Sequence, residues 1–459
     1  MDRKQFTRLD RWLAQTTRKP LIIRGARQVG KTALVRLFAE RCRRPLTEIN
    51  LERHRNLADV FARNDPTYIL NVLEGLPRIE PIRSDSILFL DEIQSVPEAI
   101  AALRYFKEDM NRLPVLAAGS LLDFSLSDHN WSMPVGRITY LHMGSMSFTE
   151  FLNAVGAEGL ARAIINFDIE QGLDPVIHEL LIEHLRDYYF VGGMPEAVEA
   201  YRLTRQMRAV QEVHASIIDT YREDFPKYIG SRNLARIVNV FNSAAQNVGQ
   251  KVKYVHYSRD DQAATIKSDI ELLCMARVFS KVVHSSCNGL PLQADSDSRT
   301  YKLIYMDIGL MTAACGISWE SIQSATELQL VNEGPMAEQF IGQHLQYLLA
   351  ESPNRELSYW LREGQSSNAE VDYVVAIDGR VVPIEVKTGA TGTLKSLHQF
   401  VAEKGIPLAV RFNASAASVH DIKTRVYVRG KQVPSQYCLL SLPLYLIEQL
   451  PAILSSLQR

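Results

Sequence analysis

Short runs of apolar residues divide the first 120 residues into strands, each followed by a polar loop. Leu21–Ile23, Ile87–Leu90 and Leu113–Ala117 contain almost only apolar side chains. Unbroken apolar runs of this length are typical of strands that are buried on both faces of a parallel sheet. After the first run, an apolar face with helical spacing begins at Leu34. The pattern predicts a strand, a loop and a helix, followed by further strands of one α/β domain.

The middle of the chain has a different pattern, in which helical periodicity precedes the strands. Residues 231–247 predict an amphipathic helix, and residues 258–286 predict two helices joined by a turn and then a strand. Ser258, followed by two aspartates, provides an N-cap and an acidic first helical turn. Helices followed by strands are the outline of a winged helix, which we expect over residues 226–330.

The last part of the chain predicts a helix over residues 330–351, followed by strands. Asp378 and Gly379 separate two of the apolar runs, and this residue pair is typical of a tight hairpin. The hairpin would place Asp372 on the strand next to the one that carries Glu385 and Lys387. The expected strands are Tyr359–Leu361, Val371–Ile377 and Val381–Val386.

Composition indicates an ordinary globular protein of several domains. The chain has 459 residues, of which 46% are hydrophobic and 22% are charged. Its five cysteines are odd in number and form no CxxC pair, which favours reduced thiols in the cytoplasm. No run of 18 apolar residues occurs, so we expect no membrane association and a cytoplasmic location.

The net charge of −1 provides no overall attraction to nucleic acid, but the charge is unevenly distributed. Residues 1–55 hold 15 Lys and Arg against 5 Asp and Glu, and residues 225–267 hold 7 against 2. The second stretch would present its basic side chains to phosphates; alternatively, these side chains are only solvated, or the domain is a spacer or a dimer surface. The residues concerned are Lys251, Lys253, Arg259 and Lys267.

Gly25 to Thr32 fit the phosphate-binding pattern G-x-x-x-x-G-K-[ST], between a predicted strand and a predicted helix. Glycines let the backbone wrap the phosphates, Lys31 would reach the β- and γ-phosphates, and the Thr32 hydroxyl would bind Mg²⁺. The sequence therefore predicts ATP and Mg²⁺ as cofactors. The residues expected around the nucleotide are Gly25, Ala26, Arg27, Gln28, Val29, Gly30, Lys31, Thr32, Ala33 and Asp91.

Candidate catalytic residues follow the next two strands. Asp91 and Glu92 end the second apolar run, where Asp91 would hold Mg²⁺ and Glu92 would polarise the attacking water. Ser120 ends the third run and would sense the γ-phosphate, or would only cap a helix or loop. Arg137 is a candidate arginine finger, in cis or in trans, although a loop arginine is more often a surface residue.

Several stretches together resemble the prokaryotic AAA-type ATPases that carry a C-terminal domain of unknown function with a restriction-endonuclease-like fold. They are RGARQVGKT, LFLDEIQ, AAGS, VGRITYLHMGSMSFTEF, YYFVGGMPEAV, YREDFPKYI and YKLIYMDIGLM. The resemblance implies hydrolytic roles for Asp91, Glu92 and Ser120, and it favours a role for Arg137. It also implies a helical lid over residues 146–225. AAA relatives often form rings, so a homo-oligomer is expected as one option beside a monomer.

The triplet Glu385-Val386-Lys387 is ambiguous by itself, because acid-x-Lys also occurs at Asp2-Lys4 and Asp421-Lys423. Its neighbours follow the order Glu…Asp…Glu-x-Lys of PD-(D/E)XK nucleases. The resemblance implies that Glu338, Asp372 and Glu385 hold a metal ion and that Lys387 is catalytic. Gln399 on the following helix adds to the match.

We therefore expect four parts with an α/β fold class: a P-loop ATPase core with a parallel sheet (1–145), the lid (146–225), a winged helix (226–330) and a nuclease-like α/β domain (331–459). The expected function is Mg-ATP hydrolysis coupled to a nuclease-like domain that binds nucleic acid, with DNA cleavage as an open option. The main alternative is a nucleotide-dependent regulatory switch with a non-catalytic C-terminal module. A metabolic P-loop kinase fits less well, because no small-substrate signature accompanies the P-loop.

Overall fold

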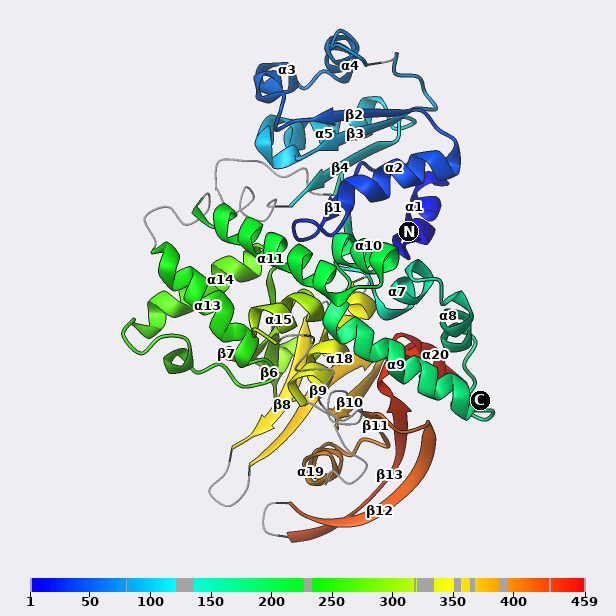
Figure 1. Ribbon diagram of the computed structural model, residues 1–459, viewed down its shortest axis with the longest axis vertical. Helices are drawn as coiled ribbons and strands as arrows, with labels where there is room; N and C mark the ends of the chain where they lie inside the picture. Colours follow the sequence, from blue (N-terminus) through cyan, green and yellow to red (C-terminus); the bar gives the residue numbers. More distant parts are fainter. Residues whose placement is uncertain are drawn as a thin grey trace. The chain divides into compact units, whose positions relative to one another are not determined.

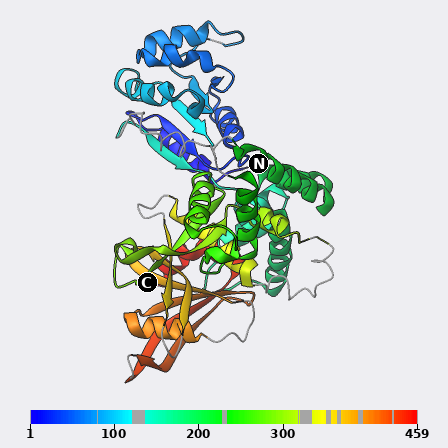
Figure 2. The ribbon, with the colours of Figure 1, turned by 90° about the vertical axis from the view of Figure 1, so that its left-hand side faces the viewer.

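The structure is a computed structural model, and the chain divides into two compact units that are described separately (Figure 1 and Figure 2). The first unit is Met1–Met146 with Met275–Val278, and the second is Ser147–Cys274 with Phe279–Arg459. The residues described are 2–79, 81–120, 136–226, 233–317, 319, 334–350, 356–363, 368–387, 394–428 and 431–457.

The first unit is built on a five-stranded sheet whose strands are all parallel. Every residue of β3 and β4 is buried, as the unbroken apolar runs predict. The predicted parallel sheet is therefore confirmed. In order across the sheet, the strands are β2 (Leu46–Asn50), β3 (Ile87–Asp91), β4 (Val115–Gly119), β1 (Leu21–Arg24) and β5 (Thr139–His142).

One face of this sheet packs against three helices that follow β2 and β3. Leu88 and Leu90 of β3 share one core with Phe61, Ile69 and Leu103, which lie on these helices. Asp65 caps the second of them, because its side chain accepts the first backbone N–H groups. The helices are α3 (Ala58–Ala62), α4 (Pro66–Glu74) and α5 (Pro97–Asp109); the unit also contains α1 (Gln5–Leu13) and α2 (Lys31–Cys42).

The first part of the second unit is helical, in the region where the lid is expected. Ser147 and Glu150 form a reciprocal capping box that starts the first helix. Among the described residues from 147 to 226, the helices are α7 (Phe148–Ala154), α8 (Glu158–Ile165), α9 (Pro175–Val191), α10 (Pro195–Thr204) and α11 (Met207–Asp224).

Two of the quoted motifs meet at a buried aspartate, which links α9 to α15 (Ile308–Ala314). Asp307 is fully buried; its Oδ2 accepts the Gly193 N–H at 2.7 Å, and its Oδ1 accepts the Leu310 N–H at 3.1 Å. Gly192 has φ +68°, and a Cβ at this position would collide with the Asp307 carboxylate. Only glycine fits at position 192, which explains the presence of Gly192 next to the aspartate.

A buried histidine supports the same turn and makes stability depend on pH. His214 on α11 donates from Nε2 to the Val191 carbonyl at 3.0 Å, and burial lowers its pKa to about 4. In the unfolded chain the pKa is about 6.5. As the pH falls below about 6.5, the unfolded chain therefore takes up a proton that the folded chain does not bind until about pH 4. Stability is lost over this range.

We expect His214 to account for a loss of about 2 kcal/mol in unfolding free energy between pH 7 and pH 5. His214→Gln removes the titrating group, so the variant should lose about 2 kcal/mol less than the wild type over this interval in urea titrations. The exposed His420, changed to glutamine, is the matched control and should behave like the wild type. An equal pH dependence in wild type and His214→Gln would contradict the assignment.

The second unit also contains an eight-stranded mixed sheet, in the order β12-β13-β11-β10-β9-β8-β6-β7. β9 and β10 form the predicted hairpin with Asp378 and Gly379 at its tip, where both φ angles are positive at 48° and 73°. The strands are β6 (Phe279–Ser285), β7 (Ser296–Tyr305), β8 (Leu357–Arg362), β9 (Ala369–Ile377), β10 (Arg380–Val386), β11 (Leu408–Asn413), β12 (Ser418–Val428) and β13 (Lys431–Pro443).

Helices border this sheet. α19 packs against β9, β12 and β13, and Figure 1 shows it beside the β12–β13 hairpin. α18 packs against β7, β8 and β10 and begins near the residue expected to be the first metal ligand, Glu338. The remaining helices of the unit are α13 (Leu234–Gln246), α14 (Ala263–Met275), α18 (Gly334–Leu349), α19 (Lys395–Lys404) and α20 (Leu450–Ser456).

The prediction of two helices within residues 258–286 is wrong. A single helix, α14, occupies this stretch before β6, because no glycine or proline interrupts Ala263–Met275. α13, α14, β6 and β7 follow the order of a winged helix, but β6 also pairs with β8. The sheet therefore runs across residue 330, and a separate winged-helix domain stays a prediction.

Two features considered in the sequence analysis, membrane-spanning helices and cysteines, can be examined in the described residues. No helix among them is long and apolar enough to cross a membrane. All five cysteines lie in the described parts of the chain, and all have free thiols.

Candidate functional site

The P-loop connects the end of β1 to the start of α2. The backbone turns through Gln28 and Gly30, whose φ angles are +61° and +90°, and α2 begins at Lys31. A Cβ at position 25 would collide with the carbonyl oxygen of Met143, so only glycine fits there. The strand, loop and helix predicted for phosphate binding are therefore present, with Gly25 at the close backbone approach and Gly30 at a positive φ.

Lys31 is held inside the loop. Its Nζ donates to the carbonyl oxygens of Gly25 at 3.1 Å and Ala26 at 2.7 Å. The side chain is 7% exposed, and burial lowers its pKa to about 8, although Glu92 and Asp91 act in the opposite direction. A polyphosphate would supply the negative charge that favours the ammonium form.

Arg3 supports the loop from the N-terminal segment, and the sequence pattern alone does not identify it. This buried guanidinium donates to the carbonyl oxygens of Val29 at 3.2 Å and Gly144 at 2.8 Å. It thereby connects the loop to the chain that follows β5.

The acidic residues at the end of β3 face the P-loop threonine. The Thr32 hydroxyl donates to Asp91 Oδ2 at 2.9 Å, which joins the two predicted Mg²⁺ ligands. Burial raises the pKa of Asp91, and the hydrogen bond from Thr32 acts against this shift. A hydroxyl and a carboxylate are oxygen donors of the kind that Mg²⁺ prefers, so Thr32 and Asp91 fit this cation.

Glu92 lies directly beside this pair with a left-handed backbone, φ +51°. Its carboxylate accepts hydrogen bonds from Gln94 Nε2 at 2.5 Å and from the Ser120 hydroxyl at 3.5 Å. The structure thus brings Glu92 and Ser120 together. Gln94 was not predicted, because a glutamine two residues after the acidic pair carries no signal in a single sequence.

Arg137 does not contact these residues in the described part of the first unit. Its Nε donates to Glu108 of α5 at 3.0 Å, and the Arg137 side chain is 47% exposed. A role as an arginine finger stays a prediction.

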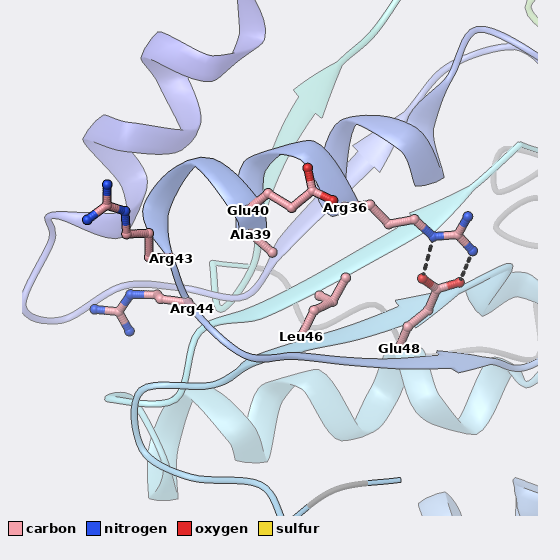
Figure 3. A pocket seen from close by; sticks show the side chains of 7 residues that line it. All are labelled: Arg36, Ala39, Glu40, Arg43, Arg44, Leu46 and Glu48. Carbon is pink, nitrogen blue, oxygen red and sulfur yellow. Dashed lines mark hydrogen bonds and ion pairs between the residues drawn. The ribbon is translucent and has the colours of Figure 1, made fainter. Parts of the chain in front are cut away.

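A separate pocket lies along the C-terminal half of α2 and the edge strand β2 (Figure 3). Arg36 forms two hydrogen bonds of 2.7 Å with Glu48, which tie α2 to β2, and Arg43 and Arg44 line the other end. The pocket is built from residues beyond the first turn of α2, so it does not include the phosphate-binding residues.

In the second unit, the hairpin places Asp372 beside the triplet that contains Glu385. Asp372 Oδ2 accepts the Val386 N–H at 2.7 Å, and Lys387 Nζ lies 2.5 Å from Glu385 Oε1. Glu385 is buried, and its Oε2 has no hydrogen-bond partner among the residues that the structure describes. The predicted grouping of Asp372, Glu385 and Lys387 is therefore present.

Burial and charge both act on this group. Burial raises the pKa of Glu385, the Asp372 charge raises it further, and Lys387 opposes both. Burial alone would lower the pKa of Lys387, but the adjacent Glu385 raises it. For Glu385, burial and the Asp372 charge outweigh Lys387, so the pKa of this carboxyl group lies above its ordinary value.

Glu338 lies on α18, the helix on which it was expected, and a lysine from β7 pairs with it. Lys302 Nζ lies 2.8 Å from Glu338 Oε1, forms an ion pair with Glu370 and lies 3.9 Å from Asp372. Burial would lower the pKa of Lys302, but the three carboxylates raise it above its usual value. A lone lysine within the apolar run YKLIY was the only sequence signal for this residue.

These residues do not fit the expected metal site. In the described parts of the chain, no group of three or more His, Cys, Asp or Glu side chains is arranged to hold a metal ion. Gln399 also points elsewhere, since its Nε2 donates to Glu403 at 2.6 Å and to the Tyr427 carbonyl at 3.1 Å. The metal role of Glu338, Asp372 and Glu385 stays a prediction.

Fold and site together define the first unit as a P-loop nucleotide-binding domain with an acidic pair at the end of β3. A family model described as an AAA domain matches residues 17–152. Residues 17–152 thus form an AAA-type ATPase domain, as predicted. Two further models, both described as domains of unknown function, match residues 182–321 (DUF8612) and 333–436 (DUF4143). The first of these runs across the boundary expected at residue 225.

Solved structures with similarity to the chain include ORC2 of Aeropyrum pernix, crystallised as ADPNP-ADP complexes. It is 13% identical and has a TM-score of 0.36, and the match covers 70% of this chain and 94% of ORC2. The branch migration motor RuvB of Thermotoga maritima is 13% identical with a TM-score of 0.29, over 61% and 90% of the two chains. TM-scores this low carry no argument about function. No curated protein matches the chain.

Proposed function

We propose that this chain hydrolyses Mg-ATP in its first unit and uses nucleotide binding to control a nucleic-acid-binding second unit. The observation that carries the first part is the contact between Thr32 and Asp91 next to Glu92. Thr32 and Asp91 would hold Mg²⁺, which supplies positive charge for the phosphates. Lys31 binds the phosphates, and Glu92 takes a proton from the attacking water.

The arrangement around Glu92 supports this role. Gln94 and Ser120 both donate to its carboxylate, so they fix its orientation. Ser120 also lies at the end of β4, next to the strand that carries the acidic pair. We therefore assign Ser120 the polar sensor role and leave Arg137 as a candidate finger in trans.

For the second unit we propose a restriction-endonuclease-like fold that binds nucleic acid. The support is the order of α18, the β9–β10 hairpin and α19, with Asp372, Glu385 and Lys387 grouped on adjacent strands. DNA is the proposed partner. A nucleotide-dependent switch that binds protein instead is the alternative, and a nucleic-acid binding assay separates the two.

The basic stretch at 251–267 offers a way to test this surface residue by residue. Lys251 pairs with Glu363 at 2.7 Å, and Lys267 lies 3.9 Å from Glu271. Lys253 and Arg259 are exposed. Lys253 and Arg259 are therefore the better candidates for phosphate contacts, because neither forms an ion pair with an acidic side chain in the described parts of the chain.

We expect Lys253→Gln with Arg259→Gln to weaken DNA binding for all sequences alike. The slope of log K against log salt should fall by up to about 0.9 for each lost contact, because fewer counterions are released. Fluorescence anisotropy with one single-stranded and one double-stranded DNA, at several salt concentrations, measures this. The control is Lys251→Gln with Lys267→Gln, which should change the slope less. Undetectable DNA binding by the wild type would favour the protein-binding switch.

The proposal includes a cytoplasmic location, since all five cysteines are free thiols. We also propose a homo-oligomer, because Arg137 can act on the nucleotide of a neighbouring subunit only if the chain forms an oligomer. Sedimentation with and without an ATP analogue tests that condition.

A further inference from the structure

Lys302 is a buried cation that the nuclease motif does not include. It lies on β7 between Tyr301 and Leu303, both core residues, and is 1% exposed. A buried lysine is costly unless negative groups surround it. Its position within an apolar strand therefore indicates that the acidic side chains around it are its partners.

Three carboxylates from two other elements converge on this ammonium. Glu338 comes from α18 at 2.8 Å, and Glu370 and Asp372 come from β9, the second at 3.9 Å. Glu338 and Asp372 are two of the three residues expected to bind the metal ion. The lysine thus lies among the oxygens that a divalent cation would use.

The surroundings of Glu338 are also tightly packed. A Cβ at position 249 would collide with the Glu338 carboxylate, so the Gly249 backbone passes directly over it. The Tyr359 ring lies 5.1 Å from Lys302 Nζ. Mg²⁺ usually keeps several of its waters and needs nearly octahedral geometry, and beside Glu338 the Gly249 backbone and the Lys302 ammonium already occupy part of that space.

Two further acidic oxygens of this group have partners. Asp372 Oδ2 accepts the Val386 N–H, and Glu385 Oε1 pairs with Lys387. Among the carboxylates of this cluster, Glu385 Oε2 is the one buried oxygen without a hydrogen-bond partner in the described parts of the chain. One such oxygen does not make a site for a hard divalent cation, which takes about six ligands.

We propose that Lys302 is a built-in counter-ion that replaces the divalent metal ion of this site, so that the second unit binds nucleic acid without cutting it. This inference extends the proposed function of the second unit. It rests on that proposed function in one respect, namely that the ligand of the second unit is a nucleic acid. Lys302 is a positioning residue, because it acts by holding Glu338, Glu370 and Asp372 in place.

The test is a Mn²⁺ titration of the full chain without nucleotide, followed by electron paramagnetic resonance. Asp91→Asn is present in every sample to remove the metal site of the P-loop. Lys302→Met should gain one Mn²⁺ site at the cluster and bind Mn²⁺ there at least about tenfold more tightly than this background, because a repelling charge a few ångströms away is removed. Adding Glu338→Gln should abolish the gained site.

Lys302→Arg is the matched control, since it keeps the cation and should gain no Mn²⁺. Circular dichroism establishes that each variant folds. Mn²⁺ binding by the Asp91→Asn chain that Asp372→Asn or Glu385→Gln removes would overturn the proposal, and so would a folded Lys302→Met chain that gains no site. If Lys302→Met does not fold, the titration of the Asp91→Asn chain alone decides.

A nuclease assay with the wild-type chain, Mn²⁺ and plasmid DNA gives a second readout. We expect no nicking above that of a buffer control, with or without ATP. Nicking that Lys387→Ala abolishes would also overturn the proposal. ATP hydrolysis and DNA binding by the wild-type chain are measured alongside this nuclease assay. Absence of either activity would contradict the proposed function, whereas nicking that depends on Lys387 would contradict only the counter-ion role of Lys302.

Discussion

Glu92→Gln should leave nucleotide bound while lowering the rate of ATP hydrolysis by about 100-fold or more, because the amide cannot accept the proton of the attacking water. The geometry makes this substitution informative, since Glu92 lies beside the Thr32–Asp91 pair without contacting Lys31 through any described hydrogen bond. Phosphate release measures turnover, and titration with a fluorescent ATP analogue measures binding.

Two further variants define what the Glu92 result means. Lys31→Ala should abolish nucleotide binding itself, because it removes the charge that neutralises the phosphates. Glu98→Gln, in the first turn of α5, is the matched control and should hydrolyse ATP at the wild-type rate. Hydrolysis at the native rate by Glu92→Gln would remove the role assigned to that carboxylate.

Asp307→Ala should destabilise the second unit by about 3 kcal/mol. The substitution leaves the buried Gly193 N–H without its acceptor and removes the N-cap of α15. Because a buried donor without a partner costs about 1–3 kcal/mol and a lost cap costs about 1 kcal/mol, the two effects together are large for a protein of ordinary stability. Urea unfolding followed by circular dichroism measures the shift.

Asp174→Ala is the matched control for this prediction. Asp174 also caps a helix, since it accepts the Val176 N–H at 2.8 Å, but it is exposed. Its loss should cost only about 1 kcal/mol, because water satisfies the freed N–H group. Equal destabilisation by the two substitutions would show that burial of Asp307 contributes nothing.

The sequence pattern was sufficient to predict each feature that depends only on residues close together in the chain. The P-loop, the buried strands β3 and β4 and the Asp378-Gly379 hairpin were all predicted, because glycine positions, apolar runs and turn pairs are properties of neighbouring residues. The grouping of Asp372 with Glu385 also followed from the sequence, since a two-residue hairpin fixes which residues of its strands face each other.

The sequence by itself was thus sufficient to predict the AAA-type ATPase domain. It was also sufficient to predict the hairpin that places the acid-x-Lys triplet beside Asp372. Only the tertiary structure decided what lies around these residues. The Lys302 ammonium reaches Glu338 from 36 positions away, and Arg137 pairs with Glu108 of another element. β6 extends the sheet across the expected boundary at residue 330. Contacts of this kind depend on which elements pack together in the folded chain. The sequence alone therefore does not indicate whether a charged residue will bind a ligand or pair with another side chain.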